Sequence, residues 1–110
     1  MKLDIQFRGM KTSQALSHLV ERKLHTSLSR FGQRIQSVEV RIGDVNGPKG
    51  GDDKYCRVSL QTPLGPVTVC KGAADPYAAV HVTVERLERA MARKLERARS
   101  IRRRPQRLAS

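Results

Sequence analysis

The sequence is short of aromatic residues and cysteine, and each shortage excludes a class of structure. Aromatic residues make up 4% of the 110 residues and tryptophan is absent, so the core must consist mainly of valine, leucine, isoleucine and alanine. The two cysteines, Cys56 and Cys70, are too few for a disulfide framework or a cysteine metal site. No run approaches the roughly 18 consecutive apolar residues of a membrane span. The N-terminus also lacks the apolar segment of a signal peptide, which predicts a cytoplasmic protein.

Acidic residues are scarce in comparison with basic ones. The chain contains 22 Lys and Arg against 10 Asp and Glu, which gives a net charge of +12. Such a charge destabilises the compact state through self-repulsion unless an anionic partner neutralises it. Nucleic acid is the leading candidate for that partner, ahead of an anionic membrane surface.

Alternation of apolar and polar residues predicts four strands. They are expected over residues 2–8, from near Ile35 to Ile42, over residues 55–61 and from Val67 onward. The segment between the second and third strands, residues 43–53, holds four glycines and one proline, which is typical of a loop. A tight turn at residues 63–66 predicts that the last two strands pair as a hairpin. The alternation places Cys56 inside and Cys70 outside, so a disulfide between them is not favoured.

Two segments have helical periodicity. The first begins at Ser13, a residue type that caps helices, and is expected to end at Gly32. The second begins with an Asp-Pro pair at residues 75–76 and can continue to about Arg104, because Pro105 forbids further helix. The order β-α-β-β-β-α predicts an α+β domain, with a four-stranded, mostly antiparallel sheet and both helices on one face.

The second predicted helix separates apolar from basic residues. At about 100° per residue, each kind falls in its own arc of about 80°, and the two arcs are nearly opposite. The apolar arc holds Tyr77, Val80, Val84, Leu87, Met91, Leu95 and Ala98, and the basic arc holds Arg86, Arg89, Arg93, Arg97 and Arg104. The spacing of Tyr77 favours a core position, with an RNA-stacking ring as the alternative.

The C-terminal fifth of the chain concentrates the positive charge. Residues 86–107 hold ten Lys or Arg and two Glu, so 10 − 2 = +8 of the total +12 lies there. Like charges three or four residues apart weaken an isolated helix by about 0.2–0.5 kcal/mol per pair, which indicates a partner rather than a solvated face. Arginine suits phosphate contacts and base stacking. Because no helix-turn-helix, zinc-finger or basic-zipper pattern is present, folded RNA is favoured over DNA.

The order of the elements and several short segments carry a family resemblance. The most specific is Asp75-Pro76-Tyr77-Ala78-Ala79-Val80, followed by Arg86-Leu87-Glu88-Arg89. Leu3-Asp4-Ile5, Ser13-Gln14-Ala15-Leu16 and Val67-Thr68-Val69 fit the same pattern. The chain resembles the short form of the ribosome hibernation-promoting and ribosome-associated inhibitor proteins, the sigma-54 modulation family. The resemblance covers residues 1–98, the expected ribosome-binding domain, and leaves residues 99–110 as a basic C-terminal extension.

The resemblance implies a fold similar to double-stranded-RNA-binding domains and a site in the mRNA and tRNA channel of the small ribosomal subunit. The implied function is occlusion, which silences idle ribosomes under stress or in stationary phase. The implied partners are the 30S subunit or 70S ribosome and its 16S rRNA. Neither a membrane nor a small-molecule substrate is expected, and the protein should be monomeric away from the ribosome. Dimerisation of ribosomes is left open.

The implied RNA-binding residues lie on both predicted helices, and we call them the basic set. Arg86, Arg89 and Arg93 match basic positions of the family's last helix, and Lys23 and Arg30 match its basic first helix. Arg22, Lys94 and Arg97 are added on charge and position alone.

Two other functions are kept as alternatives: modulation of an alternative sigma factor, and nonspecific nucleic-acid binding by the C-terminal extension. An enzyme, a cofactor and a metal site are not expected. His18, His25 and His81 have no Cys, Asp or Glu at ligand spacing, and no Gly-rich nucleotide-phosphate loop is present.

Overall fold

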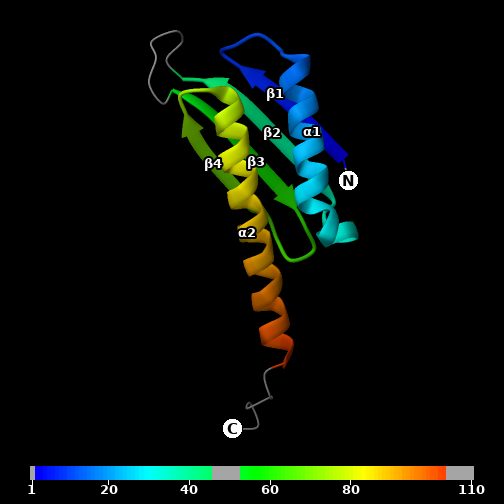
Figure 1. The fold of residues 1–110 in the computed structure, drawn as a ribbon. Helices are drawn as coiled ribbons and strands as arrows, with labels where there is room; N and C mark the ends of the chain where they lie inside the picture. Colours follow the sequence, from blue (N-terminus) through cyan, green and yellow to red (C-terminus); the bar gives the residue numbers. More distant parts are fainter. Residues whose placement is uncertain (1, 46–52, 104–110) are drawn as a thin grey trace.

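The structure, a computed structural model, describes residues 2–45 and 53–103, in which a four-stranded sheet carries both helices on one face (Figure 1). In chain order the elements are β1 (Lys2–Arg8), α1 (Gln14–Leu28), the short 3-10 helix η1 (Ser29–Arg34), β2 (Ser37–Asp44), β3 (Lys54–Gln61), β4 (Val67–Ala73) and α2 (Pro76–Arg103). The predicted α+β class and the order of its strands and helices are confirmed. No helix within these described ranges is long and apolar enough to cross a membrane.

The strands lie in the sheet in the order β1-β2-β3-β4. β1 pairs parallel with β2 across the α1 crossover, whereas the other two pairings are antiparallel. The predicted hairpin of β3 and β4 is confirmed, and Gly65 supplies the positive φ of 109° that its turn needs. The Thr62 hydroxyl closes this turn by donating to the Gly65 carbonyl at 2.7 Å. β4 is therefore an edge strand of this sheet, and no described strand pairs with its outer side.

α1 begins where the sequence predicted and ends earlier. The Ser13 hydroxyl accepts a hydrogen bond from the Leu16 N–H at 3.2 Å, the expected N-cap contact. The α-helix stops at Leu28 and continues as η1, in which Gly32 has a φ of 54° and bends the chain toward β2. Gly32 thus kinks the 3-10 segment, which continues to Arg34, and Phe31 stays in the core.

The core lies between the helices and the sheet and has the aliphatic composition that the sequence predicted. α1 contributes Leu16, Val20, Leu24 and Leu28, and α2 contributes Ala79, Val80, Val84, Leu87 and Met91. β2 and β3 supply the facing layer with Val38, Val40, Ile42, Cys56, Val58 and Leu60. These contacts fix the rotation of each helix about its own axis, and so decide which side chains remain exposed.

The side chains of the two cysteines lie on opposite faces of the sheet, as alternation predicted. Cys56 is buried, Cys70 is exposed, and both thiols are free. The Thr83 hydroxyl of α2 donates to the Cys56 carbonyl at 3.0 Å, which ties α2 to β3. Burial raises the pKa of the Cys56 thiol to about 12, so this thiol stays protonated and unreactive at neutral pH.

The connection between β2 and β3 is shorter than the predicted loop of residues 43–53. Gly43 and Asp44 are the last two residues of β2, and Asp53 is buried next to β3. Glycine is needed at residue 43 for packing: a Cβ there would stand only 2.5 Å from the Tyr55 ring. The part of the predicted loop at residues 46–52 lies outside the described residues.

Candidate nucleic-acid interface

The start of α2 sets the direction in which its arginines point. The Asp75 carboxylate accepts a hydrogen bond from the Tyr77 N–H at 2.7 Å, as expected of an acidic cap. The expectation that Tyr77 lies in the core is wrong, since its side chain is 44% exposed. Tyr77 belongs to the first turn, and the helix first meets the sheet at Ala79 and Val80, which are fully buried.

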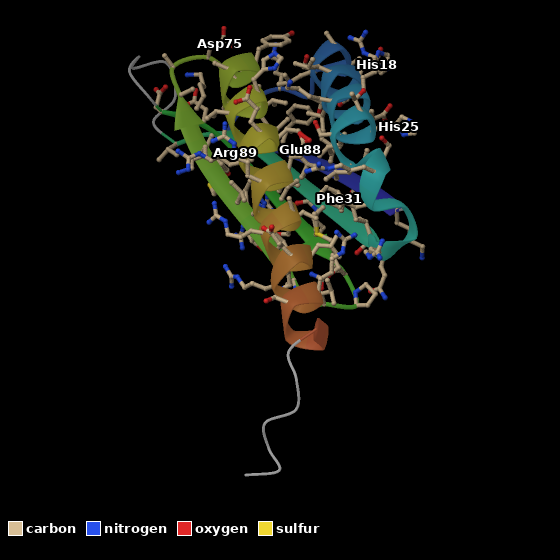
Figure 2. All side chains as sticks on the ribbon, turned by 60° about the horizontal axis from the view of Figure 1, so that its bottom comes forward. His18, His25, Phe31, Asp75, Glu88 and Arg89 are labelled. Atoms are coloured by element: carbon tan, nitrogen blue, oxygen red, sulfur yellow. The ribbon has the colours of Figure 1, made fainter. Side chains whose placement is uncertain are left out.

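Four arginines along α2 are exposed, as predicted from their spacing. Arg86, Arg89, Arg93 and Arg97 all have exposed side chains, and none has an ion-pair partner within the described part of the chain. Figure 2 shows Arg89 on the side of α2 toward β4 and Glu88 on the side toward α1. The helix therefore carries different charges on its two flanks.

A groove of about 350 Å³ lies between α2 and the edge strand β4. Its lining residues are Thr68, Val69, Cys70 and Lys71 of β4 and Arg86, Arg89, Ala90 and Arg93 of α2. Four of these eight residues are cations and none is acidic, so the groove attracts anions. We call it the β4–α2 groove.

Lys71 is the cation of this groove that the sequence analysis did not predict. It shares the strand parity of Val67 and Val69, which face the helices, so its side chain leaves β4 on the helix side of the sheet. A lysine at an apolar position of an alternating strand was the signal that could have found it. Its position at the sheet edge lets it remain partly exposed beside α2.

The α1 side of the basic set is separate from the groove. None of Arg22, Lys23 and Arg30 is among the groove's lining residues. The Arg30 guanidinium lies 3.9 Å from the Glu88 carboxylate and 4.7 Å from the centre of the Phe31 ring. Arg30 therefore has an acidic partner within the protein, in contrast to the arginines beside β4.

Lys94 and Arg97 extend the basic surface toward the C-terminal end of α2. Lys94 is partly buried and lies over the β3–β4 turn, where its Nζ would be 3.4 Å from a Cβ at Gly65. Arg97 is exposed one turn beyond Arg93. Arg104, the last arginine of the predicted stripe, lies outside the described residues.

The family of this chain follows from comparison with known proteins. The profile of the family described as "Sigma 54 modulation protein / S30EA ribosomal protein" matches residues 3–99. The chain belongs to this family. The match spans the sheet, α1 and the part of α2 that forms the β4–α2 groove, and it ends close to the predicted boundary at residue 98. α2 itself continues without interruption to Arg103.

Solved structures share the fold of this S30EA family member. A ribosomal subunit interface protein from Coxiella burnetii superposes with a TM-score of 0.71 at 20% identity, covering 86% of this chain and 99% of its own. The N-terminal domain of Protein Y from Thermus thermophilus superposes with a TM-score of 0.64 at 26% identity, covering 80% of this chain and 92% of its own. None of the curated proteins matches the sequence. The family is ribosome-associated, which agrees with the resemblance seen in the sequence.

Proposed function

We propose that this protein binds the small ribosomal subunit in the channel for mRNA and tRNA and thereby silences idle ribosomes. The observation that carries the proposal is the acid-free β4–α2 groove in a chain of the S30EA family. A ribosomal subunit interface protein with the same fold supports it further. The protein would act in the cytoplasm, where ribosomes work, during stress or stationary phase.

The mechanism is occlusion and needs no chemical step. Basic side chains pair with phosphates of 16S rRNA and release the counterions condensed on them, which gives an affinity that falls steeply with salt. The folded domain then fills volume that mRNA and tRNA need. Because the bound domain blocks mRNA and tRNA simply by filling their site, inhibition should be proportional to the fraction of ribosomes that hold the protein.

The structure divides the proposed RNA contacts into two groups. Arg86, Arg89 and Arg93 line the groove, and Lys94 and Arg97 lie near it on α2. Arg22, Lys23 and Arg30 belong to α1 and η1 and would contact a different RNA segment. A channel with RNA on several walls can engage both groups at once.

Sedimentation of cell lysate through a sucrose gradient at physiological salt tests the proposal. The protein should travel with 30S or 70S particles, and it should inhibit a purified translation system in proportion to its occupancy. Ribosomes that already hold mRNA and tRNA should resist inhibition. Recovery of the protein only at the top of the gradient would contradict ribosome binding.

A second candidate is modulation of an alternative sigma factor, which the family description names. Under this alternative the protein should co-purify with RNA polymerase after nuclease treatment. The cationic groove favours the ribosome, because its lining of four cations and no acid suits the phosphates of ribosomal RNA.

A further inference from the structure

We propose that the β4–α2 groove holds one strand of RNA phosphodiester backbone, with Lys71 as a binding residue beside Arg86, Arg89 and Arg93. This inference rests on the proposed function and deepens it, since it names the surface of the domain that faces the RNA. It also separates that surface from the cations of α1, which lie outside the groove.

Among residues 2–45 and 53–103, the cations of the groove lack the acidic partners that other cations of this fold have. Arg30 is paired with Glu88, and the Lys54 ammonium lies 3.0 Å from the Asp53 carboxylate. In the groove, by contrast, a lysine from a strand meets three arginines from a helix and no acid. This arrangement stores repulsion in the free protein, and a polyanion in the groove removes it.

The shape of the groove favours a chain of phosphates. Arg86 and Arg93 are seven residues apart, so at about 1.5 Å per residue their Cα atoms lie about 10 Å apart along the helix axis. That length exceeds a single phosphate group and fits a strand running along the helix. The walls are a helix and a sheet edge, a concave form that an extended strand fills and a flat membrane surface does not.

Lys71 places a positive charge on the β4 side of the groove, opposite the arginines of α2. Lys71 pairs across the ladder with buried Cys56, so its backbone is fixed by β3 while its side chain reaches the gap toward α2. Val69 and Ala90 supply apolar surface between the two walls. A backbone strand in the gap would therefore be contacted by cations from both sides.

Cys70 provides a reporter at the edge of the groove, on the strand between Val69 and Lys71, with its side chain on the face of β4 away from the helices. It is exposed and lines the groove, and the chain's other cysteine, Cys56, is buried with a raised pKa. Alkylation by N-ethylmaleimide at neutral pH should therefore report Cys70 alone. We expect purified 30S subunits to slow alkylation of Cys70 in proportion to the bound fraction of the protein.

Charge variants test Lys71 directly. Lys71→Gln should weaken 30S binding and reduce the slope of log affinity against log salt by about 1, the value for one lost phosphate contact. Lys71→Glu should weaken binding further. Arg8→Glu is the matched control, because Arg8 is exposed on β1 at the opposite edge of the sheet; it should have the smaller effect. Circular dichroism should show the native fold for each variant.

The outcomes separate this proposal from ribosome binding itself. If 30S subunits bind while Cys70 reacts at the free rate and Lys71→Gln keeps the wild-type salt slope, the groove proposal is overturned and ribosome binding stands. If 30S subunits do not bind but a single-stranded RNA oligonucleotide protects Cys70, ribosome binding fails and the groove stands. Protection by phosphatidylglycerol vesicles but not by RNA would overturn the groove as an RNA site.

Discussion

The two flanks of α2 face different neighbours and carry different charges. The flank toward β4 presents Arg86 and Arg93 to the groove with no acidic partner there. The flank toward α1 presents Glu88, which pairs with Arg30 (Figure 2). The difference shows that the net charge of a helix understates its local charge, because the fold places the two signs on different sides.

Reversing charge on the β4 flank should have the largest effect. The double change Arg89→Glu and Arg93→Glu removes two groove cations and adds repulsion toward phosphate. At roughly 1.4 kcal/mol for each reversed charge, 30S affinity should fall by about 100-fold or more. Sedimentation measures the loss, and circular dichroism checks the fold, since both side chains are exposed. Undiminished binding by a natively folded variant would show that the β4 flank does not face the RNA.

Deleting residues 99–110 should have a smaller effect on ribosome binding. The deletion leaves the groove intact and removes only charge beyond it, so 30S binding should weaken but persist. Binding to random-sequence duplex DNA at the same salt should weaken more strongly, because such binding depends on total charge and the deletion removes five of the 22 Lys and Arg. Complete loss of 30S binding on this deletion would show that the extension recognises the ribosome. The charge difference between the two flanks of α2 would then not explain binding.

Burial of Cys56 beneath α2 should make the free energy of unfolding depend on pH in the alkaline range. The Cys56 pKa is raised from 9.0 to about 12 in the folded protein, so above pH 9 the unfolded chain loses a proton that the folded chain keeps. This contribution to stability is complete below pH 9 and is lost as pH rises toward 12, by up to about 1.4 kcal/mol per pH unit. Urea unfolding from pH 8 to about pH 11 measures it.

Two variants isolate the Cys56 contribution. Cys56→Ala should flatten part of the alkaline slope, whereas Cys70→Ser should keep it. The pKa of Lys54 is raised by its hydrogen bonds to Asp53 and Asp44, and its contribution is the same in every variant and cancels in the comparison. Equal slopes in all three proteins would show that Cys56 does not remain protonated under α2.

Neutralising the α1 flank should have the smallest effect. Glu88→Gln breaks the pair with Arg30, and exposed pairs contribute about 0–1 kcal/mol. Thermal unfolding should therefore change little. 30S binding should stay the same or tighten slightly as Arg30 is released, and a clear weakening would show that Glu88 itself takes part in the contact.

The strands and helices were predictable because their signals are local. Ser13 caps α1 and Asp75 caps α2, and both contacts depend on residues two or three positions away. Gly43 and Tyr77 were misassigned because their environments are set at longer range or by the geometry of a helix end. Glycine content indicated a loop at residue 43, whereas the Tyr55 ring across the ladder explains the glycine within a strand.

The candidate site was predictable in part. Helical spacing alone indicated that Arg86, Arg89 and Arg93 are exposed. The groove could not be predicted, because it depends on β4 being the sheet edge beside α2 and on Lys71 reaching across that gap. The sequence also grouped Arg30 with the other cations, since nothing in it shows that Glu88 pairs with Arg30.

The order of strands in the sheet has a consequence for synthesis. Because β1, β2, β3 and β4 lie side by side in the order in which they are translated, each new strand can join the one made just before it, without rearrangement. β4 and α2 come last among the described elements, and the groove lies between them. We expect that a nascent chain presents no finished β4–α2 groove to the ribosome that is making it until its final elements emerge.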